Sequence, residues 1–156
     1  MKRILLTFRL FAGALLIAMG MLVISPAAHA APNKAPNATA ARSVSVTFHN
    51  ETTHNLTLRY SQVLSGVWTL QPKIYVGSTV ETYWGTASNG FMTGTSGTVW
   101  YDFDDGKYIT MKWNDPYVGS NSYTFSGTAL GAGGFQIVRS GGSGNNAQVT
   151  LTLQPK

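Results

Sequence analysis

The residues of this chain whose types could support catalysis or metal binding are two histidines and a set of aspartates. His49 and His54 bracket the short segment 50–53, so both imidazoles could reach one metal ion if the flanking strands pair, with Glu51 as a third ligand. Carboxylates that would suit a Ca²⁺ site or a catalytic carboxylate pair are Asp102, Asp104, Asp105 and Asp115.

Structural roles account better for these polar residues. Asp104 and Asp105 precede Gly106 in a turn-forming sequence, and Asp115 precedes Pro116, which is a common loop position. The chain has no cysteine, no pair of neighbouring glutamates, no nucleophile-elbow motif around a serine and no glycine-rich strand-to-helix loop. We therefore expect no enzymatic activity, no bound metal and no cofactor.

Binding chemistry is better represented, in large apolar side chains that the sequence places in glycine-rich loops. These residues are Phe91, Met92, Tyr117, Val118 and Tyr123. Aromatic rings in loops at the end of a β-sandwich are the groups that settle at the headgroup level of a membrane. The alternative is that they cap the open end of the sandwich.

A predicted β-hairpin between Thr98 and Trp113 positions two further aromatic candidates. Asp104-Asp105-Gly106 fits a three-residue loop, and this loop sets Tyr101 opposite Ile109. One face of the hairpin is then apolar, with Val99, Tyr101, Phe103, Ile109, Met111 and Trp113. The other face carries Trp100, Asp102, Tyr108, Thr110 and Lys112. On that face Trp100 and Tyr108 either meet a second sheet or form an exposed aromatic patch.

The remainder of residues 43–156 predicts further strands and no helix. Apolar side chains alternate with polar ones in 44–48 and in 56–60, as expected for half-buried strands. Aromatic side chains that we expect to face the core are Phe48, Tyr60, Tyr101, Phe103, Trp113 and Phe135. About nine strands separated by turn signals are typical of a sandwich or barrel. The predicted fold is all-β, a single-domain antiparallel β-sandwich.

The first 30 residues have the features of a signal peptide. A basic start with Lys2, Arg3 and Arg9 precedes an apolar stretch over 10–24, and Ala28-His29-Ala30 matches a cleavage signal. We predict cleavage after Ala30 and secretion, with an uncleaved membrane anchor as the alternative. Residues 31–42, rich in Ala, Asn and Pro, predict a disordered linker that cannot form an amphipathic helix.

Composition restricts the partners of the exported chain. Removal of the leader lowers the formal net charge from +5 to +2, and no basic patch remains that would suit a phosphate backbone, so no nucleic-acid partner is expected. Charged residues make up 11% of the chain, against about 25% in average proteins. With no cysteine, the fold must rely on packing alone.

The segment 89–123 resembles two families of lipid-recognising proteins. Thr93-Gly94, Gly97, Tyr101, Asp105-Gly106 and Pro116-Tyr117 resemble the central hairpin of the actinoporin cytolysins. The resemblance to the aegerolysins is stronger and rests on Trp113-Asn114, Pro116-Tyr117, Gly119 and Ser120. Both families are small β-sandwiches, so the resemblance implies an aegerolysin-like, or actinoporin-like, sandwich domain over residues 43–156.

The resemblance also implies binding residues. Actinoporins hold a phosphocholine headgroup with residues that match Ser96, Asn114 and Pro116, with Tyr117 adjacent, and a later tyrosine matches Tyr123 after a shift of one position. The remaining actinoporin tyrosines have no counterpart, because 129–146 contains no tyrosine. Our candidate residues for binding a lipid headgroup or membrane are therefore Ser96, Trp100, Tyr108, Asn114, Pro116, Tyr117, Tyr123 and Phe91.

The implied function is binding of membrane lipids, in bilayers that contain sphingolipids or sterols, by a secreted cytolysin or toxin component. Actinoporins perforate membranes with an N-terminal amphipathic helix, which residues 31–42 cannot supply. We therefore expect a separate pore-forming partner protein, as is common for aegerolysins. The alternative is a lectin-like, carbohydrate-binding module on the same architecture, in which Trp100 and Tyr108 stack on a sugar.

Overall fold

The predicted central hairpin forms in the predicted register. The computed structural model describes residues 41–156, and in it β6 (Thr95–Phe103) pairs with β7 (Tyr108–Asp115), with Val99 opposite Met111 and Tyr101 opposite Ile109. The loop closes through a 3.1 Å hydrogen bond from the Gly106 N–H to the Phe103 carbonyl, and Gly106 has a φ of +83°. A left-handed residue at this position is what a three-residue hairpin loop requires, and glycine adopts it without a steric penalty.

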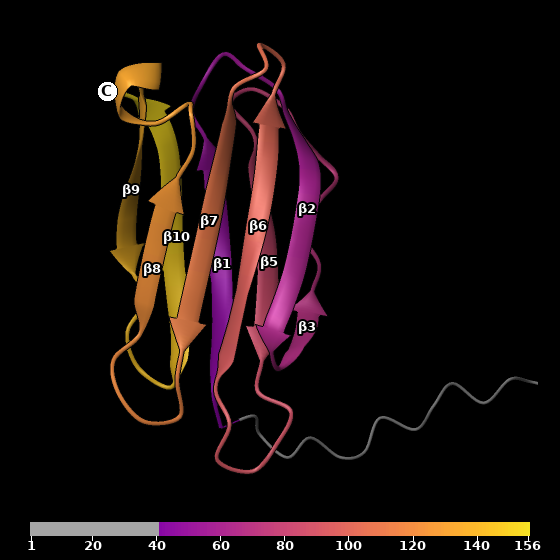
Figure 1. The fold of residues 1–156 in the computed structure, drawn as a ribbon, viewed down its shortest axis with the longest axis vertical. Coiled ribbons are helices and arrows are strands. Elements are labelled where there is room, and N and C mark those ends of the chain that lie inside the picture. The colour runs from indigo at the N-terminus through magenta and orange to yellow at the C-terminus, as the bar shows by residue number, and fades with distance from the viewer. Residues whose placement is uncertain (1–40) are drawn as a thin grey trace, which may run out of the picture. The chain divides into compact units, whose positions relative to one another are not determined.

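Between residues 41 and 156, ten strands form two sheets that lie face to face (Figure 1). The first sheet has the order β3-β5-β1-β10-β9, and the second sheet has the order β4-β2-β6-β7-β8. The other strands are β1 (Ser43–Asn50), β2 (Leu56–Ser65), β3 (Val67–Leu70), β4 (Tyr75–Val76), β5 (Glu81–Ala87), β8 (Ser122–Ser126), β9 (Phe135–Gly141) and β10 (Asn146–Pro155). The predicted all-β sandwich is confirmed.

Helical structure in the described part of the chain is limited to one short 3-10 turn, η1 (Gly131–Gly133). No helix within residues 41–156 is long and apolar enough to cross a membrane. The predicted signal peptide and all but the last two residues of the predicted linker lie outside the described residues.

The core lies between the two sheets and draws on both. Val44, Val46 and Phe48 on β1 are buried, as their alternation predicted, and all six residues of the predicted apolar hairpin face are buried as well. The Phe48 ring stacks on the Tyr101 ring, with centroids 6.1 Å apart and planes 4° from parallel, and it also contacts Trp84. Large buried aromatic side chains of this kind account for much of the stability of a small sandwich.

One pair of strands departs from the predicted antiparallel arrangement. β1 and β10 pair in parallel, with Ser43 opposite Asn146 and Asn50 opposite Leu153, whereas every other strand pair is antiparallel among the described residues. The two strands run through the middle of the first sheet, between β5 and β9. A period-two pattern identifies a strand but not the direction of its neighbour, so the sequence could not show this pairing.

The prediction that Tyr60 faces the core is wrong, because β2 contains a β-bulge. Leu58 pairs with Tyr101 and Tyr60 pairs with Trp100, the next residue back along β6, so Arg59 is an extra residue on β2. A bulge reverses the faces to which the following side chains point. Leu56 and Leu58 therefore point inward, whereas Tyr60 lies on the outer face of the second sheet and is 46% exposed.

Candidate functional site

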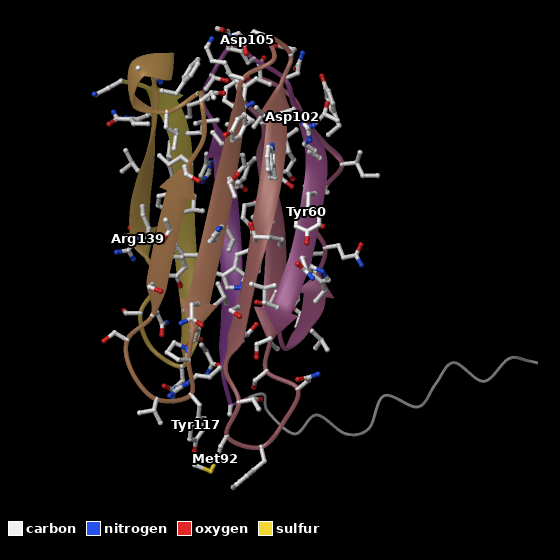
Figure 2. All side chains as sticks on the ribbon, in the orientation of Figure 1. Tyr60, Met92, Asp102, Asp105, Tyr117 and Arg139 are labelled. Atoms are coloured by element: carbon white, nitrogen blue, oxygen red, sulfur yellow. The ribbon has the colours of Figure 1, made fainter. Side chains whose placement is uncertain are left out.

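Three exposed apolar side chains and the half-buried Tyr117 lie at one end of the sandwich, on two loops. The β5–β6 loop (88–94) carries Phe91 and Met92, and the β7–β8 loop (116–121) carries Tyr117 and Val118. Figure 2 shows Met92 and Tyr117 at this same end, which we call the apolar tip. Phe91 is 92% exposed, Val118 80% and Met92 54%. The candidates Phe91, Pro116 and Tyr117 thus lie at the same end, and the expectation that these loop side chains have no role in the core holds for Phe91, Met92 and Val118.

Arg42 fixes the conformation of the β7–β8 loop. Its Nε donates a 3.0 Å hydrogen bond to the Pro116 carbonyl, another guanidinium nitrogen donates to the Tyr117 carbonyl, and the guanidinium lies 5.4 Å from the centroid of the Tyr117 ring. The Arg42 backbone also exchanges two hydrogen bonds with Ser88, which begins the other loop of the tip. Arg42 was assigned to the linker from the sequence, but its contacts make it part of the packed domain.

A buried carboxylate lies directly behind the apolar tip. Asp115, the last residue of β7, is 1% exposed, and neither of its carboxylate oxygens has a hydrogen-bond partner. The nearest cationic atom is the Arg42 Nε, 3.8 Å from Oδ1. Burial raises the pKa of the Asp115 carboxyl to about 6, and the positive charge of Arg42 opposes that rise.

The other acidic side chains of the described residues lie toward the opposite end. Figure 2 shows Asp105 in the turn farthest from Met92 and Tyr117, with Asp102 near it. His54 contacts Asp104 at 2.6 Å, and His49 contacts Glu81 at 3.0 Å, in the same half of the molecule. The apolar tip therefore carries no exposed carboxylate within residues 41–156, so it can approach a membrane without desolvating one.

Trp100 and Tyr108 lie on the outer face of the second sheet, where both side chains are partly exposed. Their rings stack with centroids 4.7 Å apart, and the β2 bulge adds Tyr60 beside them. The hollow around these rings, which we call the aromatic groove, has a volume of about 630 Å³ and is lined by Arg59, Tyr60, Thr98, Trp100, Tyr108, Thr110, Lys112 and Ser126.

Polar contacts hold the rings of the aromatic groove in place. The Trp100 Nε1–H donates a 3.0 Å hydrogen bond to Asp102, and Arg59 donates to the same carboxylate at 3.1 Å. The Arg59 guanidinium also lies 5.3 Å from the centroid of the Trp100 ring. Because indole, guanidinium and carboxylate fix one another, the Trp100 ring is presented to a ligand in one orientation.

Ser96 and Asn114 face each other across β6 and β7, between the apolar tip and the aromatic groove. They line a separate hollow of about 280 Å³, which shares Lys112 with the aromatic groove. Two hollows joined by Lys112 thus run along the outer face of the second sheet.

Tyr123 lies apart from the other candidates. It belongs to β8, not to a loop, and it pairs with Trp113, so its ring packs against the core. Its hydroxyl donates a 3.0 Å hydrogen bond to the Gly142 carbonyl, and the Arg139 guanidinium lies 5.1 Å from its ring centroid. The expectation that Tyr123 is a free loop aromatic is therefore wrong.

The two histidines do not converge on one site. β1 and β2, which flank the turn between them, belong to different sheets, and each histidine contacts its own carboxylate. Within residues 41–156, no group of three or more His, Cys, Asp or Glu side chains is arranged to hold a metal ion.

No protein-family model and no curated protein sequence matches this chain. Among solved structures, the lipid binding protein Nakanori matches with a TM-score of 0.64 at 15% identity, over 73% of this chain and 71% of its own. The RahU protein, in complex with a TRIS molecule, matches with a TM-score of 0.60 at 18% identity, over 74% of this chain and 96% of its own. A variant of the Xerocomus chrysenteron lectin XCL matches with a TM-score of 0.48 at 11% identity, over 72% and 97% of the two chains. The Nakanori and RahU matches establish a shared fold, in agreement with the aegerolysin-like sandwich that the resemblance implied.

Sequence reasoning missed three residues that shape these sites. Tyr60 was assigned to the core because no sequence signal marks the bulge at Arg59. Arg42 was assigned to the linker, although its place directly before the first strand could have suggested a role in the domain. Arg139 attracted no attention because its neighbours come from other parts of the chain.

Proposed function

We propose that this chain is a secreted protein that binds membrane lipids through its apolar tip. The observation that carries the proposal is the exposure of Phe91 and Val118, on two separate loops, at an end with no exposed carboxylate in the described part of the chain. The match in fold to a lipid binding protein supports the proposal. Signal-peptide cleavage and secretion, inferred from residues 1–30, belong to the same proposal.

The area of the apolar tip supports reversible binding. Full burial of a side chain such as Phe, Met or Val contributes about 1.5 to 3 kcal/mol, so three of them at an interface contribute roughly 5 kcal/mol. An energy of about 5 kcal/mol corresponds to a dissociation constant below the millimolar range. Tighter and lipid-selective binding would need polar contacts to the headgroup as well.

The finer proposal follows the aegerolysin resemblance. The protein selects bilayers that contain sphingolipids or sterols, and it acts as a cytolysin or toxin component with a separate pore-forming protein. Its own strands are committed to the two sheets, whose inner faces form the core.

Vesicle sedimentation tests the proposal. The purified protein should co-sediment with at least one of a set of vesicles that contain phosphatidylcholine alone, with sphingomyelin, with ceramide phosphoethanolamine, or with each of these plus cholesterol. Absence of binding to every composition would refute it. A dependence of binding on the sphingolipid or sterol would support the finer assignment.

A second candidate function is carbohydrate binding in the aromatic groove. The observation that favours it is the held Trp100 ring, flanked by Tyr60, Tyr108 and the hydroxyls of Thr98 and Thr110. Aromatic rings with polar neighbours suit a sugar, because the ring stacks on its apolar face and the neighbours hydrogen-bond its hydroxyls. A glycan array tests this function. Specific glycan binding that is lost in Trp100→Ala and is inhibited by free sugar would favour it.

A further inference from the structure

A polar pocket lies beside the apolar tip. It has a volume of about 320 Å³ and is lined by Arg42 and Arg139 together with the loop residues 119–121 and 142–145. Two of the three arginines of the described residues thus face one pocket, and no carboxylate is among the lining residues. The carboxylate of the buried Asp115 lies 3.8 Å from the Arg42 Nε but does not line the pocket. Two cationic groups against this single acid predict an anionic ligand.

Both guanidinium groups are held in place before any ligand arrives. Arg42 lies against the Tyr117 ring and donates to the Pro116 and Tyr117 carbonyls. Arg139 likewise lies against the Tyr123 ring and donates to the Gly141 carbonyl. An arginine fixed in this way loses little side-chain entropy when it binds an anion, and its planar fork matches the oxygens of a phosphate.

The loops that close the pocket are joined to each other. The Asn121 Nδ2 donates hydrogen bonds to the carbonyls of Gly142 at 3.1 Å and Gly144 at 2.9 Å. Gly119, Gly142 and Gly144 all have positive φ, at +110°, +89° and +85°. Glycine-rich turns of this kind let an anion approach backbone N–H groups closely, and the Ser120 and Ser143 hydroxyls add donors.

We propose that this pocket binds the phosphate group of a membrane phospholipid. The proposal rests on the proposed function and specifies the polar contact that the apolar tip needs. Gly119 directly follows Val118, so a lipid whose acyl region surrounds the Val118 side chain would carry its phosphate within reach of the pocket. The apolar tip then supplies affinity for the bilayer, and the two arginines supply selectivity for a phosphate-bearing headgroup.

Two variants and a control isolate the pocket. Arg139→Gln removes one guanidinium on the edge strand β9, and Ser143→Asp adds a carboxylate to an exposed loop. Lys73→Gln removes the same charge as Arg139→Gln from an exposed position outside the pocket. Near-identical melting curves of the four proteins would establish that all are folded.

Titration with inorganic phosphate tests whether the pocket binds phosphate in the absence of a membrane. In ¹H–¹⁵N spectra of the labelled protein, phosphate should shift the amide signals of 119–121 and 142–145 saturably, with an affinity about tenfold weaker in Arg139→Gln and unchanged in Lys73→Gln. Absence of a saturable shift in the native protein would overturn the proposal.

Vesicle sedimentation identifies the source of the phosphate. Phosphatidylcholine–sphingomyelin vesicles should be bound about tenfold more weakly by Arg139→Gln and by Ser143→Asp than by the native protein or Lys73→Gln. Vesicles of a galactolipid, which has no phosphate, should be bound equally weakly by all four.

The outcomes separate this proposal from the proposed function. If both pocket variants bind vesicles as strongly as the native protein does, the pocket assignment is wrong, and the proposed membrane binding is unaffected. Saturable phosphate binding with no preference for phosphate-bearing vesicles overturns the lipid as the source. Failure of the native protein to bind any vesicle overturns both the proposed function and the lipid assignment.

Discussion

The Arg42 Nε donates a 3.0 Å hydrogen bond to the carbonyl oxygen of Pro116, which lies 74 residues further along the chain. Together with the bond to the Tyr117 carbonyl, it fastens the β7–β8 loop to the start of β1. Val118 is therefore presented from a loop with a fixed base, so less conformational entropy is lost when the loop meets a membrane.

Phe91→Ala should weaken membrane binding by about 1 to 3 kcal/mol, the transfer free energy of one large apolar side chain. Because the Phe91 ring is almost fully exposed, the free energy of unfolding should stay the same within about 0.5 kcal/mol. Vesicle sedimentation measures the first quantity and urea denaturation the second. A large loss of stability would show that Phe91 packs in the fold and is not a membrane contact.

Trp113→Ala is the matched control for an aromatic residue of the core. Its ring is buried against Trp68, with centroids 5.7 Å apart, and its Nε1–H donates to the Thr86 hydroxyl at 3.0 Å. Truncation should cost about 3 to 5 kcal/mol of stability. Any loss of membrane binding in this variant should follow the unfolded fraction.

The purified protein should bind vesicles without releasing their contents. A membrane-spanning strand needs about 9 to 11 residues with a lipid-facing apolar side, whereas the apolar sides of these strands form the core. Calcein-loaded vesicles of a composition that the protein binds provide the measurement. Release by the protein alone would mean that a segment of the sandwich refolds in the bilayer.

Asp115→Asn should raise the free energy of unfolding at neutral pH, because it removes a buried carboxylate whose destabilising effect depends on pH. Burial raises the pKa of this carboxyl to about 6 in the folded state, whereas its pKa in the unfolded chain is near 4. The stability of the native protein is therefore fully retained below pH 4, where the buried carboxyl is neutral, and it falls as the pH rises through 6 and the carboxyl ionises. The amide that replaces the carboxyl stays neutral, so the variant should gain up to about 3 kcal/mol relative to the native protein between pH 4.5 and pH 7.5.

Urea denaturation of both proteins at several pH values measures this difference. The contacts of His49 with Glu81 and of His54 with Asp104 are common to both proteins and cancel in the comparison. Arg42 is the charged group that faces Asp115, with its Nε 3.8 Å from Oδ1. A difference in stability that does not change with pH would contradict the prediction.

Gly97→Ala should destabilise the protein by about 1 to 3 kcal/mol, the cost of overpacking a core. A Cβ at this position would lie 2.4 Å from the Trp113 Cζ2 and 2.5 Å from the Gln62 carbonyl oxygen, so both the ring and the neighbouring strand would have to move. Gly106→Ala is a useful comparison, because its Cβ would meet nothing within 4 Å and only the positive φ is strained, at a cost of about 1 to 2 kcal/mol. Equal melting temperatures of the native protein and Gly97→Ala would refute the close packing.

The register of the central hairpin could be predicted because it depends only on residues that are close together in the sequence. Alternating side chains identify the two strands, and Asp104-Asp105-Gly106 identifies the loop length, so the register from Val99 to Met111 follows. The bulge at Arg59 was not predictable, because bulges depend on how two sheets must twist to pack and leave no fixed residue pattern here. Tyr60 was placed on the wrong face for that reason.

The residues of the candidate sites likewise differ in whether the sequence alone reveals them. Phe91 and Val118 could be found from the sequence, because large apolar residues among glycines have no core partner nearby. The pair Arg42 and Arg139 could not, because the two residues are brought together only by the arrangement of the sheets. Tyr123 was misread as a loop residue, although the short strand that contains it was predicted.

The parallel pairing of β1 with β10 sets a condition on how the chain folds. Ser43 and Asn146, which are joined by a side-chain hydrogen bond, are 103 residues apart, and the strands that they begin occupy the middle of the first sheet. Contacts between such distant segments give a high contact order, which slows folding. Until its last strand is available, the chain has an incomplete sheet and no closed core.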